Sequence, residues 1–131
     1  LEKLKIFPDE IKQRQRVADY YSEGLKDIVS IPLVQENTSS VWAQYTILLE
    51  DNKDRENLQN HLKEIGIPTA VYYPKPLQEQ VAYKNCYLPG QNLDISKSLS
   101  ERVLSLPMHA YLTTQQQDRI IKAISEFIAK K

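Results

Sequence analysis

The order of residue patterns between positions 41 and 73 constrains the fold of this chain more than any other feature. The stretch VWAQYTILL (41–49) is rich in aromatic and β-branched residues, which favours a strand. A helical pattern follows, capped by Asp54 and carrying apolar residues at spacings of four and three. Gly66 ends this helix, and IPTAVYY (67–73) indicates a returning strand. Strand, helix, glycine and strand in this order are typical of a split βαβ unit in a small α/β sandwich.

Further helical patterns lie before and after this unit. The first covers the opening residues, pauses at Pro8 and resumes to about Leu25. A second is marked by apolar residues at 95, 99 and 103, and the last begins at a T-x-x-Q capping box formed by Thr113 and Gln116. Together the elements predict an α/β fold of the α+β type, a small domain with a short, mostly antiparallel sheet and helices packed on one face.

The composition excludes several classes of function. Lys plus Arg and Asp plus Glu both number 17, so no net charge attracts nucleic acid or an anionic membrane, and no apolar run is long enough to span a bilayer. The lone Cys86 rules out a disulfide framework and fits a reducing cytoplasm. Three glycines cannot build a phosphate loop, and His61 and His109 lack the spacing of metal ligands. The chain therefore lacks a self-contained active site.

Tyr72 and Tyr73 are the candidate ligand-binding residues. Side chains alternate along a strand, so we expect one ring to enter the core and the other to face outward or into a cleft. Pro74 and Pro76 restrict the backbone that follows, which would hold both rings in preset positions. Phenols can hydrogen-bond sugar hydroxyls or phosphate oxygens. From the residues alone, two core or interface aromatics are an equally good interpretation.

Three long stretches follow one another in this chain: SVWAQYTILL, LQNHLKEIGIPTAVYYPKPLQEQVAY and SLSERVLSLPMHAYLTTQQQDRIIKAI. In this order they resemble the carboxy-terminal small domain of the DegT/DnrJ/StrS family of nucleotide-sugar aminotransferases, which depend on pyridoxal phosphate (PLP). The most specific motifs are GIPTAV-x-YP-x-PL, and LSLP followed by a loop and LT-x-x-Q. The resemblance covers nearly the whole chain, from about Gln13 to Ile124.

The resemblance implies that residues 1–131 form a single carboxy-terminal small domain of a larger aminotransferase. The chain starts inside a helical pattern, so we expect residues 1–25 to continue from a large domain that lies before Leu1. That domain would bind PLP and supply the Schiff-base lysine, so no catalytic, cofactor or metal residue is assigned here, and Lys75 is not given the Schiff-base role. We expect the isolated fragment to be inactive.

The resemblance also assigns Tyr72 and Tyr73 to substrate binding. Tyr73 keeps the tyrosine of the family's His-Tyr-Pro segment, whereas Tyr72 replaces its histidine with a phenol that carries no positive charge near neutral pH. Gln78 likewise replaces a histidine that commonly follows Pro-Leu. In this family the small domain closes over the site and the enzyme acts as a homodimer.

The substrate class follows from a weaker resemblance. AQYT and GIPTAV are similar to the branch that aminates UDP-linked 3-keto acetamido sugars, including uronic acids, for surface polysaccharide. The implied reaction uses an amino donor such as glutamate.

Two alternatives to an aminotransferase domain stay open. The chain could be a free-standing α/β module that binds a ligand or partner, or a catalytically dead homologue that serves as a scaffold.

Overall fold

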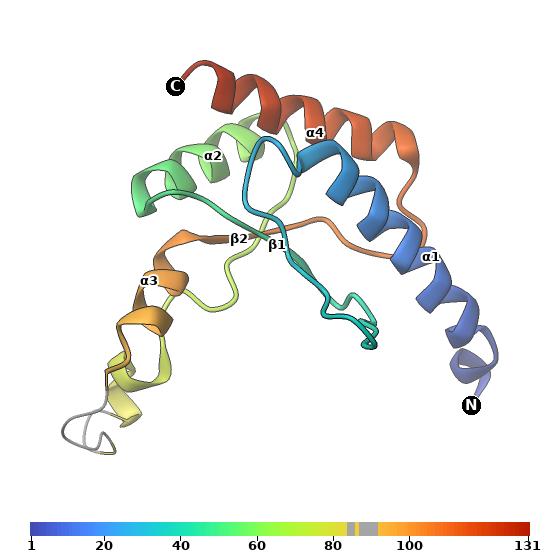
Figure 1. Cartoon of the computed structure of the whole chain (residues 1–131), viewed down its shortest axis with the longest axis horizontal. Coiled ribbons are helices and arrows are strands. Elements are labelled where there is room, and N and C mark those ends of the chain that lie inside the picture. Colours follow the sequence, from blue (N-terminus) through green and yellow to red (C-terminus); the bar gives the residue numbers. More distant parts are fainter. Residues whose placement is uncertain (84–85, 87–91) are drawn as a thin grey trace.

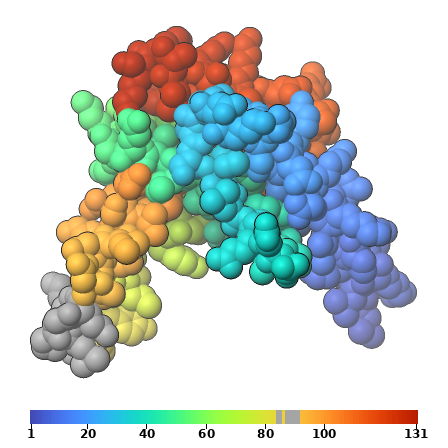
Figure 2. Space-filling model, viewed as in Figure 1, coloured from blue at the N-terminus to red at the C-terminus, as the bar shows by residue number. Residues whose placement is uncertain are grey.

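The computed structural model describes residues 1–83, 86 and 92–131 of the chain. Its described part has the shape of an arch, with α1 descending on one side and α3 on the other (Figures 1 and 2). No described helix is both long enough and apolar enough to cross a membrane. In chain order, the elements are α1 (Glu2–Leu25), β1 (Tyr45–Leu48), α2 (Asn52–Glu64), two 3₁₀ turns (Leu77–Glu79 and Val81–Tyr83), α3 (Asp94–Arg102), β2 (Val103–Leu106) and α4 (Thr114–Ala129).

The strands β1 and β2 pair antiparallel, with Tyr45 opposite Leu106 and Thr46 opposite Ser105. A single antiparallel bridge joins Ala70 to Ser105. The helices α1, α2 and α4 lie together on one side of the strands (Figure 1). The predicted fold class, a small α+β domain with an antiparallel sheet covered by helices on one face, is therefore confirmed.

The core lies between this sheet and its helices. Tyr45 and Ile47 alternate with their neighbours, so both point toward the helices, where they are fully buried. Burial of a large apolar side chain stabilises the fold by about 1.5–3 kcal/mol. The apolar stripe of α4 faces this core, since Ile120 and Ile124 are buried. The other buried helix residues include Val17, Ala18, Tyr21 and Leu25 of α1 and Leu58 and Leu62 of α2.

Two buried phenols keep their hydrogen bonds inside this core. The Tyr21 hydroxyl donates to the carbonyl oxygen of Pro107 at 3.1 Å, and the hydroxyls of Tyr45 and Ser22 lie 3.0 Å apart. Their rings also pack together, with centroids 5.0 Å apart. Burial raises the pKa of both Tyr21 and Tyr45, so each remains a neutral hydrogen-bonding group.

The helices α1 and α4 approach each other closely at Gly24. A Cβ at this position would lie 2.6 Å from Cδ1 of Ile121. Nearby, the buried Gln117 side chain donates from Nε2 to the carbonyl oxygen of Val17 at 2.9 Å. α1 continues past Gly24 to Leu25, and the glycine makes room for α4.

The ends of α2 and α4 test the predicted caps. α2 begins after Asp51, whose Oδ1 accepts the Asp54 amide proton at 2.8 Å, so the prediction that Asp54 is the cap was wrong by one turn. A cap accepts from an amide two or three residues further on, which is the place Asp54 occupies. Gly66 ends the helix region with φ of 76°, and Thr113 and Gln116 form the predicted capping box.

The predicted pause at Pro8 does not occur, because α1 runs through it without a break. The proline removes one amide donor, but the turns on both sides remain helical. Lys3 and Glu10 form an ion pair across it, with Nζ and Oε1 2.6 Å apart.

The helix predicted from apolar residues at 95, 99 and 103 ends earlier than expected. Val103 begins β2 and does not belong to the preceding helix.

Of the two strands predicted around α2, the first is shorter than expected and the second does not form, so the predicted split βαβ unit is wrong in its returning strand. Of the stretch 41–49, only Tyr45–Leu48 is a strand, because Trp42 adopts a positive φ of 49° that interrupts the extended backbone. Residues 67–73 make one bridge and no strand. Pro68 and Pro74 flank that bridge and lack the amide protons that a longer ladder needs.

Candidate functional site

The side of the sheet opposite the core carries polar side chains. Thr46 and Ser105 face each other there, with their hydroxyl oxygens 2.8 Å apart. Ser105 is nearly buried, at 4% exposed, because the segment around Ala70 bridges to it from the other side. We call this side of the sheet the open face, because no helix of the α1–α2–α4 layer covers it (Figure 1).

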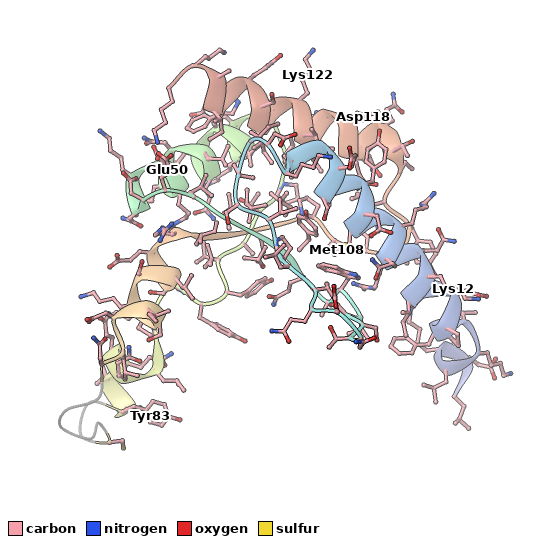
Figure 3. All side chains as sticks on the ribbon, viewed as in Figure 1. Lys12, Glu50, Tyr83, Met108, Asp118 and Lys122 are labelled. Carbon is pink, nitrogen blue, oxygen red and sulfur yellow. The ribbon has the colours of Figure 1, made fainter. Side chains whose placement is uncertain are left out.

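A hollow of about 330 Å³ lies at the edge of the open face. It is built by the residues before β1, those after α2 and those at the end of β2. Met108 marks it near the middle of the molecule (Figure 3). Every residue that lines it is uncharged. The lining consists of Ala43, Gln44, Pro68, Thr69, Ala70, Tyr72, Ser105, Leu106, Pro107 and Met108.

The two predicted site residues lie beside each other but differ in their surroundings. Tyr72 lines the hollow and is 48% exposed, whereas Tyr73 is 73% exposed and does not line it. The rings meet edge to face, with centroids 6.0 Å apart and planes at 73°. The expectation that one ring enters the core was wrong, since Val71 makes that contact.

Gln44 was not singled out from the sequence, and Gln78 was named from it without being assigned a contact. Gln44 lines the hollow and precedes Thr46 by two positions, so strand alternation could have assigned both to the same face. No sequence signal shows, however, which face meets a ligand. Gln78, which stands where the family commonly has histidine, donates from Nε2 to Ser96 Oγ at 2.9 Å and so ties the 3₁₀ turn to α3.

A larger hollow, of about 790 Å³, lies away from the tyrosines between the ends of α1, β1 and α4. Lys131 and Arg102, two of its cationic side chains, are engaged in contacts within the domain. Lys131 contacts Asp54 and lies 2.6 Å from Glu50, and Arg102 Nε donates to the carbonyl oxygen of Leu49 at 2.8 Å. These hydrogen bonds, first to Asp54 and then to Glu50, raise the pKa of Lys131. We therefore interpret this hollow as structural despite its size.

The remaining reactive side chains stand apart from the hollow. His61 is half-buried and stacks on Phe127, with the ring centroids 5.6 Å apart. His109 is exposed, and its Nδ1 accepts the Tyr111 amide proton at 3.2 Å. Cys86 is exposed. Within the described residues, no group of three or more His, Cys, Asp or Glu side chains is placed to hold a metal ion.

Comparison with known proteins gives a consistent result. A model of the DegT/DnrJ/EryC1/StrS aminotransferase family matches residues 1–125. A UDP-2-acetamido-2-deoxy-3-oxo-D-glucuronate aminotransferase from Pseudomonas aeruginosa is 41% identical over 126 residues, which are 95% of this chain and 33% of that protein.

Solved structures agree with the sequence comparison. A DegT DnrJ EryC1 StrS aminotransferase from Brucella abortus superposes with a TM-score of 0.89 and 47% identity, over 97% of this chain and 33% of the other. The PLP-form of the sugar aminotransferase Spr1654 from Streptococcus pneumoniae superposes with a TM-score of 0.87 and 25% identity, over 99% of this chain and 34% of the other. The chain thus spans about a third of the relatives it matches.

Proposed function

Because the chain belongs to the DegT/DnrJ/EryC1/StrS aminotransferase family, we propose that it is the carboxy-terminal small domain of a PLP-dependent aminotransferase that aminates a keto nucleotide-sugar. The observation that carries this proposal is the 41% identity to the Pseudomonas enzyme, which extends over 95% of this chain. That relative is named for a UDP-linked 3-oxo acetamido uronate. We extend the same substrate class to the parent of this chain, with glutamate as amino donor and surface polysaccharide as the destination.

Within the part of the chain that the structure describes, neither of the two hollows fits PLP by itself. A Schiff-base lysine must present a neutral amine, which requires a lowered pKa or a neighbouring base. The hollow beside Tyr72 has no lysine and no carboxylate in its lining. In the larger hollow, Lys131 is held as a cation by Asp54 and Glu50. In this proposal the remaining two-thirds of the parent therefore binds the cofactor, whose ring serves as the electron sink.

The role proposed for this chain is to bind and orient the sugar substrate. Tyr72 and Tyr73 together would form one wall of the sugar site, with phenols that both donate and accept hydrogen bonds. Pro74 follows them directly and limits the backbone freedom of that wall. A phenol at Tyr72 supplies no positive charge, so other groups of the parent enzyme would bind a charged phosphate or carboxylate of the substrate. We take this parent to be a homodimer in the cytoplasm.

The test of this function uses the full-length protein. After supply of PLP, borohydride reduction and digestion, mass spectrometry should find a reduced pyridoxyl-phosphate lysine upstream of Leu1. This result would establish the aminotransferase. Absence of the adduct in folded, cofactor-supplied protein would contradict it and favour a binding module or a scaffold.

A further inference from the structure

The hollow beside Tyr72 is chemically neutral, and this limits what it can bind. A buried phosphate or carboxylate needs cationic or several strong hydrogen-bond donors, because its desolvation is costly. The lining of this hollow offers one amide, a few hydroxyls and the apolar side chains of Pro107 and Met108. Such a surface suits an uncharged substituent in which a hydrogen-bonding group is attached to a methyl group.

Gln44 is the side chain with the most hydrogen-bonding capacity in this lining. Its amide has one acceptor and two donors, which matches the carbonyl and N–H of another amide. Within the described part of the chain, its side chain makes no hydrogen bond and is exposed. The hydroxyls of Thr46 and Ser105, by contrast, already bind each other. Gln44 is therefore the amide that the lining offers to a ligand, beside the hydroxyls of Thr69 and Tyr72.

Helix α1 holds the backbone that presents Gln44. Trp42, two residues earlier, has a φ of 49°, a conformation that bulky residues rarely adopt and that persists only when neighbours enforce it. Arg14 Nη1 donates to the Trp42 carbonyl oxygen at 2.8 Å, and the indole Nε1 donates to Gln15 Oε1 at 2.8 Å. The indole itself is 6% exposed. Trp42 is thus a positioning residue that directs Gln44 to the hollow's rim.

We propose that this hollow binds the acetamido group of the nucleotide-sugar, with Gln44 hydrogen-bonding to its amide and Met108 contacting its methyl. The inference rests on the proposed function and adds to it the residue that recognises one substituent. Tyr72 would border the same group from the side of the sugar wall.

The experiment measures binding of two probes to the full-length, PLP-loaded protein by isothermal titration calorimetry. UDP-N-acetylglucosamine carries the acetamido group, and UDP-glucose has a hydroxyl in its place. Gln44→Ala should weaken UDP-N-acetylglucosamine about three- to tenfold, the range of one hydrogen bond, and leave UDP-glucose within about twofold. Gln35→Ala removes an exposed amide of the same loop that does not line the hollow, and should change neither.

Each other outcome contradicts the inference in a recognisable way. Equal weakening of both probes would mean that Gln44 contacts a part the two sugars share. Unchanged binding of both would mean that it contacts neither. If the protein carries the pyridoxyl-lysine adduct and either result is found, the acetamido assignment is wrong while the aminotransferase stands. Absence of the adduct together with no binding of either sugar would overturn both proposals.

Discussion

The two faces of the β1–β2 sheet show how four-residue strands can serve two purposes. On the covered face, Tyr45 and Ile47 are fully buried against the helices. On the open face, Thr46 binds Ser105 through its hydroxyl, and the neighbouring Tyr72 remains 48% exposed. In the partner strand β2, the adjacent residues Leu104 and Ser105 likewise divide, since Leu104 is buried in the core and Ser105 lines the hollow. Substitutions one position apart should have separable effects.

The largest expected effect lies on the covered face. Ile47→Ala should lower the free energy of unfolding by about 2–5 kcal/mol, because it removes buried methyl groups and leaves a cavity. Urea unfolding of the 131-residue chain, followed through the fluorescence of Trp42, its single tryptophan, would measure the change. If Ile47→Ala lowers the free energy of unfolding less than an open-face substitution does, the covered face is not the one that stabilises the fold.

A binding effect is expected beside the open face. In the full-length protein, Tyr73→Phe should weaken the nucleotide-sugar about three- to tenfold, because one hydroxyl is lost, and leave PLP affinity unchanged. Tyr20→Phe is a matched control, since its hydroxyl binds Asp118 on α4 at 2.5 Å on the helical side of the molecule. Sugar and cofactor titrations measure both affinities. Unchanged sugar affinity would remove Tyr73 from the proposed wall.

A smaller loss of stability is expected for the hydroxyl pair of the open face. Thr46→Val keeps the shape and strand preference but leaves the nearly buried Ser105 hydroxyl without this partner. The free energy of unfolding should fall by about 1 kcal/mol. The same urea experiment used for Ile47→Ala measures it, and a loss as large as that of the core variant would show that the open face also carries the fold.

The smallest effect concerns acid pH and the descending part of α1. The hydrogen bonds from Lys3, and then from Tyr111, lower the pKa of Glu10 below its ordinary 4.5. The unfolded state therefore binds a proton first, so the stability from this carboxylate is present above about 4.5 and is lost as the pH falls through the folded pKa. Stability of Glu10→Gln should fall less steeply than wild type between about pH 5 and 3. If stability falls with pH equally steeply in wild type and Glu10→Gln, the hydrogen bonds of Glu10 contribute nothing to folding.

Several features were predictable because they depend on neighbours in sequence. The capping box at Thr113, the stop at Gly66 and the stripe of α4 arise from local hydrogen bonds, backbone conformation and a 3.6-residue period. The cap of α2 was displaced by one turn because Asp51 and Asp54 are both acceptable cap residues. Local chemistry allowed both, and in the structure Asp51 takes the cap position.

The site was less predictable because it depends on segments that are distant in sequence. Tyr72 was singled out from its unusual local context, but the expected burial of one ring was wrong, since Val71 packs against the core. Gln44 gave no signal of its own. It becomes a candidate only because residues around 70 and 107 meet it at one edge of the sheet. No local sequence pattern indicates that these three segments come together in space.

The sequence by itself determined the order of the described α-helices, the α+β class and the family, because motif order and apolar periodicity are written along the chain. Tertiary structure alone decided which face of the sheet stays open, that α1 holds Trp42 with a positive φ, and that the hollow beside Tyr72 is neutral. The physical reason is that side-chain contacts between distant segments select among backbone conformations that local preferences leave nearly equal.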